Sequence, residues 1–243
     1  MFIPYQDVNP TNSTPYVTIS LIVLNGLVFV GQLAYDFDGG MGLSAFQFGF
    51  RPASLIHPGS DIPGASPFIT LFLSMFMHGG ILHIVGNMLF LWIYGDNVED
   101  TMGHGFFLAF YLMGGIVATL THAFFNMDSV IPTIGASGAV AAVLGAYLVL
   151  FPHAKVKTFI WVFIFFMTTI YVPAWLLIGI FVLTNLFWGA VSLAGPDGPG
   201  VAWFAHLGGL AFGLLLAIPF KSRLRHAHRI HSRFNHWPSE WRI

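Results

Sequence analysis

The stretch "TIGASGAVAAVLGAY", residues Thr133–Tyr147, places a single serine at the head of a run of small apolar residues. Ser137 lies between Gly135 and Gly138, and the residues after it are almost all alanine, valine, leucine and glycine. The run predicts a membrane helix, and a serine at the start of a helix is often only an N-cap. The rest of the sequence indicates whether Ser137 is a cap or a nucleophile.

The composition of the chain indicates a membrane protein. Of the 243 residues, 56% are hydrophobic and 8% are charged, whereas a soluble domain carries about 25% charged residues. The absence of cysteine excludes disulfides, thiolate metal sites and a cysteine nucleophile. A formal net charge of -1 does not by itself bear on nucleic acid, and we expect no nucleic-acid partner. The N-terminal sequence lacks the features of a secretory signal peptide, so its first apolar run is expected to be a retained span.

Six segments approach the roughly 20 apolar residues that a membrane span needs. They are Val17–Tyr35, Pro67–Tyr94, Gly105–Phe125, Ala136–Phe151, Pro173–Val191 and Ala202–Phe220. A seventh apolar run, Thr158–Val172, is short for a span and rich in strand-forming residues. We therefore predict an all-α, polytopic membrane protein with an N-terminal segment over 1–16, a six-span domain over 17–220 and a basic tail over 221–243.

The positions of the cations predict the orientation. Of the nine Lys and Arg residues, only Arg51 lies outside two clusters, which are the pair Lys155 and Lys157 and the tail after Phe220. Cytoplasmic loops are enriched in Lys and Arg. If the seventh run does not cross the membrane, both clusters and the N-terminus lie on one face. The six-span topology thus predicts cytoplasmic termini in a cell membrane, with the first loop on the outer side.

Ser137 and His206 are predicted to lie at the same depth in the bilayer. Ser137 precedes Phe151 by fourteen residues, and His206 precedes Phe220 by fourteen. At about 1.5 Å per residue, both lie about 21 Å above the inner edge, or about 10 Å below the outer one. Small residues follow each of them at helical spacing and favour close helix packing. These are Ala141 and Gly145 after the serine, and Gly209 and Gly213 after the histidine.

His83 and Asn87, four residues apart in "HIVGN", form a third polar group at a similar depth. An amide and a neutral imidazole on one helical face can donate hydrogen bonds to an oxyanion. Alternatively, these two residues form an interhelical clamp, and His206 is a packed interior histidine. The matched depths favour catalysis, with Ser137 as nucleophile and His206 as its general base. Glu99, in the turn "YGDNVEDTMG", is expected to brace that turn or a neighbouring helix.

The motifs together resemble the rhomboid family of intramembrane serine proteases. "GASG" at Ser137, "HIVGN", "AHLGG" at His206 and the "GDNVED" turn carry this resemblance, which covers essentially the whole chain. It implies a Ser137–His206 dyad without a triad carboxylate, and an oxyanion hole formed by His83, Asn87 and the Ser137 amide. It also implies a partly membrane-embedded loop at 158–172, between the fourth and fifth helices.

The activity that the resemblance implies is cleavage of peptide bonds in or next to transmembrane segments of membrane-protein substrates. The lipid bilayer is the expected surrounding, and no cofactor or metal is expected. Two positions depart from some family members: Ile69-Thr70 replace a Trp-Arg pair, and Ala141 replaces an aromatic that stacks on the catalytic histidine. The alternative is a catalytically inactive relative that binds transmembrane helices. The sequence gives no oligomeric state.

Overall fold

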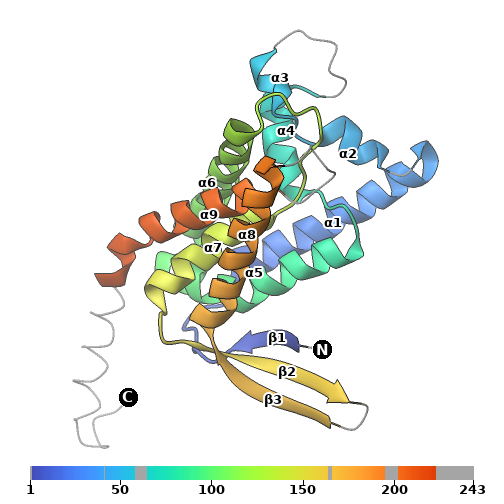
Figure 1. Cartoon of the computed structure of the whole chain (residues 1–243). Coiled ribbons are helices and arrows are strands. Elements are labelled where there is room, and N and C mark those ends of the chain that lie inside the picture. Colours follow the sequence, from blue (N-terminus) through green and yellow to red (C-terminus); the bar gives the residue numbers. More distant parts are fainter. Residues whose placement is uncertain (1, 41, 58–64, 164–165, 195–201, 223–243) are drawn as a thin grey trace, which may run out of the picture.

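The structure is a computed structural model that describes residues 2–40, 42–57, 65–163, 166–194 and 202–222. Most of these residues are helical and form one bundle (Figure 1). The helices are α1 (Tyr16–Gly39), α2 (Leu43–Phe48), α3 (Ala53–Ile56), α4 (Pro67–Leu73), α5 (Ile81–Met102), α6 (His104–Phe125), α7 (Ser137–Leu150), α8 (Ala174–Ala194) and α9 (Trp203–Leu216), with short 3-10 helices η1 (Ser74–Phe76) and η2 (Ile218–Phe220). The strands are β1 (Phe2–Asp7), β2 (Lys155–Phe163) and β3 (Phe166–Pro173).

The long helices have the composition of membrane spans. The helices α1, α6, α8 and α9 with its continuation to Phe220 are each long and apolar enough to cross a bilayer, and the bent pair of α4–η1 and α5 adds a fifth candidate. At 14 residues, α7 is only about 21 Å long. It is nevertheless apolar on all sides and buried over most of its length, as expected of a central helix. The predicted helical membrane bundle is confirmed, and the count of six crossings stays a prediction.

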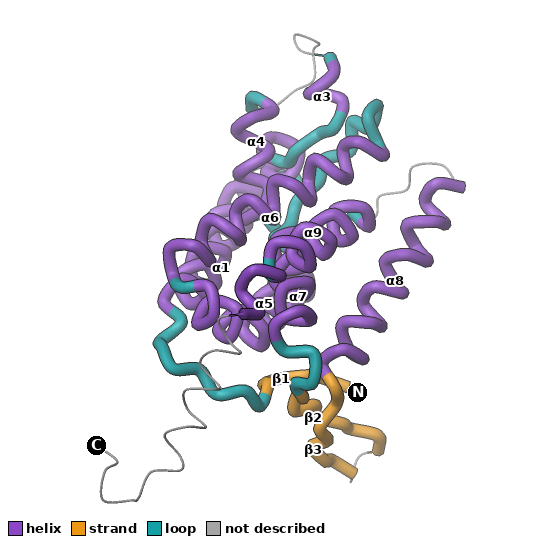
Figure 2. The backbone as a smooth tube through the Cα atoms, turned by 90° about the vertical axis from the view of Figure 1, so that its left-hand side faces the viewer, coloured by secondary structure: helices purple, strands orange, loops and turns teal. Residues whose placement is uncertain are grey.

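The peripheral position of α8 is clear when the molecule is viewed from the side. Figure 2 shows α8 at the edge of the bundle, beside α7 and α9. Exposed large apolar side chains, such as those of Leu183 and Phe187, cover much of its surface. Its buried side chains include those of Ile178 and Asn185. A polar residue on the buried face of this helix therefore lies against the centre of the bundle.

The second predicted span is broken in the structure. The prediction treated Pro67–Tyr94 as one helix, but η1 ends at Phe76, α5 begins at Ile81, and the two parts are bent by 78°. Two glycines lie in the break, and Gly80 has a φ of 159°. The helix α5 also extends to Met102, beyond the predicted end, and its polar last turns are hydrogen-bonded to the N-terminal segment. The predicted span is therefore not one continuous helix, and its second helix ends at Met102 instead of Tyr94.

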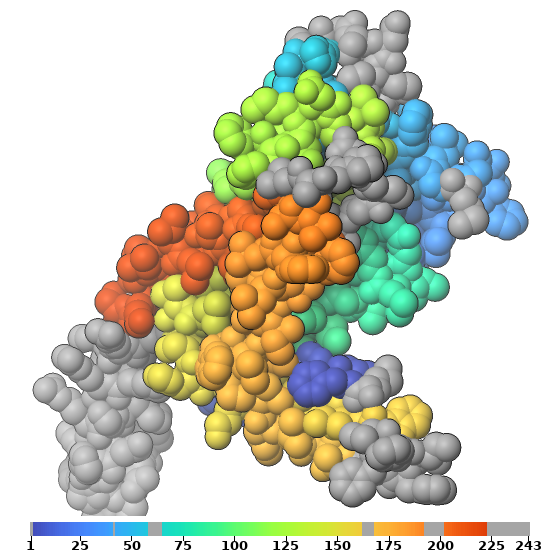
Figure 3. Space-filling view, in the orientation of Figure 1, coloured from blue at the N-terminus to red at the C-terminus, as the bar shows by residue number. Residues whose placement is uncertain are grey.

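The seventh apolar run, which was predicted to be a loop region rich in strand-forming residues, forms a β-hairpin. Strands β2 and β3 pair antiparallel from Lys155 and Pro173 to Phe163 and Phe166, and β1 pairs antiparallel with the other edge of β2. Aromatic and β-branched residues suit this pleated arrangement. The three-stranded sheet projects from one end of the helical body (Figure 3). It is an addition to the predicted all-α bundle, and its embedding in the bilayer stays a prediction.

Glu99 joins the end of α5 to the start of α1. Its fully buried carboxylate accepts hydrogen bonds from the Val17 N–H at 2.9 Å and from the N–H and hydroxyl of Thr18, each at 2.7 Å. The residue before α1 is Pro15, whose side chain cannot accept a hydrogen bond. Glu99 therefore satisfies the free N–H groups at the start of α1 from a different helix. The bracing role predicted for Glu99 is confirmed.

Asp7 fixes β1 against the bundle. Its carboxylate accepts hydrogen bonds from the Tyr147 hydroxyl at 2.7 Å, from Asn97 Nδ2 at 2.9 Å and from Asn9 Nδ2 at 3.1 Å. Burial raises the pKa of the Asp7 carboxyl to about 6, although the hydrogen bond from Tyr147 acts in the opposite direction. The N-terminal strand is thus joined to both α5 and α7 through one buried acid.

Both ends of the described chain lie toward the same end of the bundle (Figure 1). The Phe220 ring lies 4.8 Å from the ring of Phe106, near the start of α6. The start of α1 lies at the same end, beside Glu99, and so does the sheet that carries Lys155 and Lys157 (Figure 1). An even number of crossings would place these segments on one side of a membrane. Of the predicted basic tail, all but its first two residues lie outside the described part of the chain.

Candidate active site

Ser137 is the first residue of α7 and is half-buried. The turn before it depends on Gly135, which has a φ of 134° and donates its N–H to the Ser74 carbonyl at 2.8 Å. A Cβ atom at Gly135 would lie 2.9 Å from His83 Cε1 and 3.5 Å from Ser137 Oγ. Only glycine fits this conformation and space. The His83 imidazole and the Ser137 hydroxyl thus flank the same glycine.

The segment before Ser137 is held by the first loop. Phe50 and Thr133 exchange two backbone hydrogen bonds, at 3.0 and 2.7 Å. The next residue, Arg51, is 4% exposed, and its guanidinium donates to the Phe46 carbonyl and lies 4.5 Å from the centre of the Phe46 ring. An arginine that is buried in this way anchors the loop through both charge and ring contact. In this chain Arg51 therefore anchors the first loop, while Ile69-Thr70, which replace the Trp-Arg pair of some relatives, lie in α4.

The helices α7 and α9 touch along their backbones. A Cβ atom at Gly209 would overlap the carbonyl of Gly138, and one at Gly213 would overlap the carbonyl of Ala142. A Cβ at Gly145 would meet the backbone of α9 in the same way. Small residues permit such close approach of membrane helices. Of the small residues predicted to line this contact, Gly145, Gly209 and Gly213 do so.

This contact brings Ser137 and His206 to the same level of the bundle. A Cβ atom at Gly138, the neighbour of Ser137, would lie 3.8 Å from both Cβ and the carbonyl oxygen of Ala205, the neighbour of His206. The two residues are therefore level, as the depth argument predicts. The hydrogen bond between Ser137 Oγ and His206 Nε2 is not formed in the described structure. Catalytic hydrogen bonds are often long before substrate binds, so this geometry is compatible with a dyad.

The imidazole of His206 is enclosed and oriented. The residue is 6% exposed, and its Nδ1 is hydrogen-bonded to Asn185 Oδ1 on α8. The ring packs against the rings of Phe181, at 5.4 Å, and Trp203, at 6.4 Å between centres. These two aromatic residues contact the histidine in this chain, where Ala141 stands at the aromatic position of some relatives. Nε2 of His206 has no hydrogen-bond partner among the described residues.

His83 and Asn87 lie on one face of α5, as predicted. Asn87 is 8% exposed, and its Nδ2 has no partner in the described part of the chain. The exposed His83 accepts a hydrogen bond at Nδ1 from the Gly79 N–H, at 3.3 Å, and its ring lies 5.1 Å from that of His78. His78 is 3% exposed, and neither ring nitrogen has a partner within the described ranges.

Several buried donors and acceptors of the described structure are thus unpaired, although buried polar groups in proteins are nearly always paired. Among them are Asn87 Nδ2 on α5, His206 Nε2 on α9 and both ring nitrogens of His78. Unpaired polar atoms of this kind can bond to a polar group of another molecule. Within the described residues, no group of three or more His, Asp or Glu side chains is placed to hold a metal ion.

Asn185 and its contact with His206 were not predicted from the sequence. The signal was present, because Asn185 is the single amide in the apolar run from Pro173 to Val191. Polar side chains inside a membrane are expensive and commonly functional. What the sequence did not give is the rotation of α8 that turns this amide toward α9.

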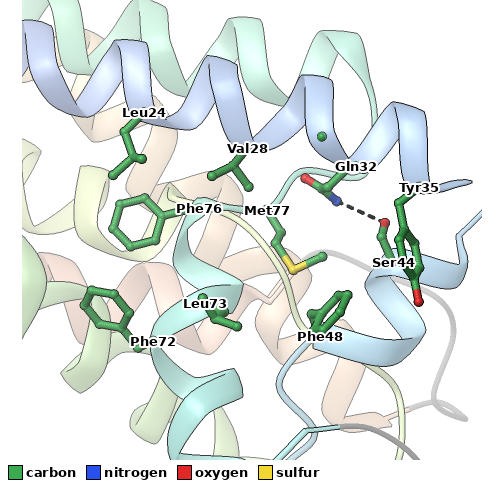
Figure 4. Close-up of a pocket in the computed structure, with 11 residues that line it drawn as sticks. Leu24, Val28, Gln32, Tyr35, Ser44, Phe48, Phe72, Leu73, Phe76 and Met77 are labelled. Carbon is green, nitrogen blue, oxygen red and sulfur yellow. Dashed lines mark hydrogen bonds between the residues drawn. The ribbon is translucent and has the colours of Figure 1, made fainter.

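An apolar pocket of about 420 Å³ lies between α1, α2, α4 and η1 (Figure 4). At its polar end, Gln32 Nε2 donates to Ser44 Oγ at 3.4 Å, and Gln32 Oε1 accepts the His78 N–H at 2.9 Å. Leu24, Phe72 and other apolar side chains line the rest. None of the residues that line the pocket is a candidate catalytic base, and its polar end contacts only the backbone of His78. The pocket is therefore not part of the candidate active site.

The fold and the site define a multi-pass helical membrane protein in which a serine and a histidine lie on two closely packed helices, next to residues that contact one another. Residues 65–223 match the family model described as "Rhomboid domain". Because this match covers more than half of the chain, the protein belongs to the rhomboid family.

Named relatives share about a third of their residues with the chain. It is 32% identical to "Rhomboid protein 1, mitochondrial" of Saccharomyces cerevisiae over 60% of this chain and 40% of the relative. It is 34% identical to "Rhomboid protease GluP" of Bacillus subtilis over 56% of this chain and 25% of the relative. It is 31% identical to "RHOMBOID-like protein 6, mitochondrial" of Arabidopsis thaliana, over 68% of this chain and 51% of the relative. The chain therefore spans about half, or less, of the length of these relatives.

Proposed function

We propose that the protein is an intramembrane serine endopeptidase that cleaves peptide bonds in or next to transmembrane segments of other membrane proteins. Ser137 is the nucleophile and His206 the general base and acid. His83, Asn87 and the backbone N–H of Ser137 form the oxyanion hole. Membership of the rhomboid family and the similarity to "Rhomboid protease GluP" of Bacillus subtilis support this proposal.

The proposed reaction proceeds through an acyl-enzyme. Ser137 Oγ bonds to the scissile carbonyl carbon while its proton passes to His206 Nε2, and negative charge develops on the carbonyl oxygen. The C–N bond then breaks, and Nε2 gives the proton to the leaving amine. A water molecule attacks the acyl-enzyme, and its proton passes through Nε2 to regenerate the Ser137 hydroxyl. The unpaired amide of Asn87 is suited to donate to the oxyanion.

The observation that carries the proposal is the backbone contact of α7 with α9. It makes Ser137 level with His206, whose Nε2 is buried and free of partners among the described residues. In the first turns of α7, the half-buried hydroxyl of Ser137 is the one side chain that can act as a nucleophile. The substrate helix must unwind at the cut, because the carbonyls of a helix are already hydrogen-bonded.

We further propose that both termini lie in the cytoplasm of a cell membrane and that the site opens toward the outer side, where hydrolytic water is available. The shared end of the bundle that holds β1, Lys155, Lys157 and the end of α9 supports this orientation. Several relatives carry the word "mitochondrial" in their names. Accessibility labelling of single cysteines at the sheet and in the first loop tests the orientation.

Cleavage of a single-span substrate in proteoliposomes tests the function. We expect the wild-type protein to produce two fragments and the Ser137→Ala and His206→Ala proteins to produce none. Equal cleavage by wild type and Ser137→Ala would contradict the proposal. If the wild type binds the substrate helix and never cuts it, the inactive, helix-binding alternative replaces the protease.

A further inference from the structure

Asn185 contacts the side of the His206 imidazole that the proposed reaction does not use. It lies in α8 and is 2% exposed. Its Oδ1 is hydrogen-bonded to His206 Nδ1, while its Nδ2 donates to the carbonyl of Phe181, one turn earlier in the same helix, at 2.7 Å. Both ends of the amide are thus used.

These two contacts fix the direction of the amide. The Phe181 carbonyl can only accept a hydrogen bond, so the NH₂ group of Asn185 must face it. The amide oxygen therefore faces His206, and because it also can only accept, Nδ1 must carry a proton. A neutral imidazole carries one proton, which leaves Nε2 as a bare acceptor. That is the tautomer in which a histidine can take a proton from a serine hydroxyl.

We propose that Asn185 is a positioning residue of the candidate active site, which holds His206 in the Nδ1–H tautomer and stabilises the imidazolium formed during the reaction. It takes the place that an aspartate or an asparagine has beside the histidine of soluble serine and cysteine proteases. This inference rests on the proposed function. The expected Ser137–His206 dyad has no triad carboxylate, and Asn185 would serve as its third member.

The surroundings of the pair suit this role. The Phe181 and Trp203 rings pack against the imidazole, and Asn185 approaches from the same helix as Phe181. An amide in an apolar span must be hydrogen-bonded, because an unpaired polar group in a membrane is costly. An amide is neutral, so it can orient a buried histidine without the desolvation cost of a carboxylate. Both polar groups of the Asn185 side chain are therefore hydrogen-bonded, and one of these bonds holds His206.

Three variants in proteoliposomes test the proposal. In Asn185→Leu, which has a similar volume and lacks the acceptor, we expect kcat to fall roughly 100-fold while KM stays within about threefold. In Asn185→Asp, the buried carboxyl group is expected to be neutral, so that its O–H donates to the Phe181 carbonyl and its C=O accepts from Nδ1, and we expect most of kcat to be retained. The matched control is Thr184→Val, because the Thr184 hydroxyl bonds the Ile180 carbonyl of the same helix at an exposed position; its kcat should equal that of wild type. Unchanged kcat in Asn185→Leu, or equal losses in the leucine and aspartate variants, would overturn the proposal.

The tautomer is measurable in the unmutated protein, which avoids any effect of a variant on folding. ¹⁵N NMR of protein labelled at histidine, with the His206 signals identified by their loss in His206→Gln, reports which ring nitrogen carries the proton. We expect a protonated Nδ1 and a bare Nε2 in wild type, and transfer of the proton to Nε2 in Asn185→Leu. A proton on Nε2 of the wild-type protein would refute the inference. If Ser137→Ala cleaved substrate as well as wild type, the protease function would fail while the NMR result for Asn185 stood unchanged.

Discussion

Replacing Gly209 by alanine should separate α7 from α9 and slow catalysis with little change in substrate binding. A Cβ atom at Gly209 would lie 3.0 Å from the carbonyl carbon of Gly138 and would overlap the attached oxygen. Carbon atoms in contact prefer a separation of about 3.5–4.0 Å, and the overlap with the oxygen is tighter still, so the helices must move apart by at least roughly 0.5–1 Å. The contact lies one residue from Ser137 and three from His206, and the shift therefore changes the distance between the proposed nucleophile and base.

The expected loss follows from that displacement. A misplacement of about 1 Å at a catalytic group lowers the rate about 100-fold, so Gly209→Ala should lower kcat by about 10- to 100-fold. KM should change little, because no substrate-contacting side chain is altered. Overpacking should also lower the free energy of unfolding by about 1–3 kcal/mol, offset in part by the better helix propensity of alanine.

The assay is steady-state cleavage of a single-span substrate in proteoliposomes, together with the thermal midpoint in detergent. The matched control is Gly179→Ala in α8, where an added Cβ meets nothing within 4 Å of the described atoms. This control should keep its kcat and gain slightly in stability. A Gly209→Ala protein with the kcat of wild type would refute the argument that the glycine contact sets the distance between Ser137 and His206.

Three further predictions concern single side chains. Glu99→Ala leaves three donors at the start of α1 unpaired and should lower the free energy of unfolding by about 3 kcal/mol in denaturant titrations, whereas Glu99→Gln keeps an acceptor and should lose less. The raised pKa of Asp7 means that its contribution to stability is fully present below its ordinary value of 3.8 and is lost as pH rises through about 6. As the pH rises from 4 to 7.5, the thermal midpoint of wild type should thus decrease by the equivalent of up to about 3 kcal/mol, and the midpoint of Asp7→Asn should change less. Identical pH profiles of the two proteins would contradict this. Asn87→Ala should lower kcat by about 100- to 1000-fold with KM nearly unchanged, and an unaltered kcat would remove Asn87 from the oxyanion hole.

The sequence predicted those features that depend on counting along a single helix. The level placement of Ser137 and His206 follows from equal distances to the ends of two helices that are predicted to run in the same direction, and the contacts of Gly145, Gly209 and Gly213 follow from small residues at helical spacing. The position of His83 and Asn87 on one face of α5 follows from their spacing of four residues. These features need only the helical period and the thickness of a bilayer.

Features that depend on the pairing of distant segments were not predictable in the same way. The apolar run after Lys155 contains strand-forming residues, but its partner β1 lies about 150 residues earlier, and nothing local specifies that pairing. The bend before Ile81 depends on packing of η1 against the rest of the bundle, and its glycines alone do not distinguish a kink from a continuous helix. The contact of Asn185 with His206 depends on the rotation of α8 about its axis.

Reaction of the membrane-embedded protein with a fluorophosphonate, followed by mass spectrometry of the modified peptide, tests the central claim most directly. A fluorophosphonate bonds to a serine only when a neighbouring base activates its hydroxyl. We predict one adduct, on Ser137, that disappears in His206→Ala. Failure of the wild-type protein to form this adduct, or equal modification of Ser137 when His206 is absent, would contradict the account.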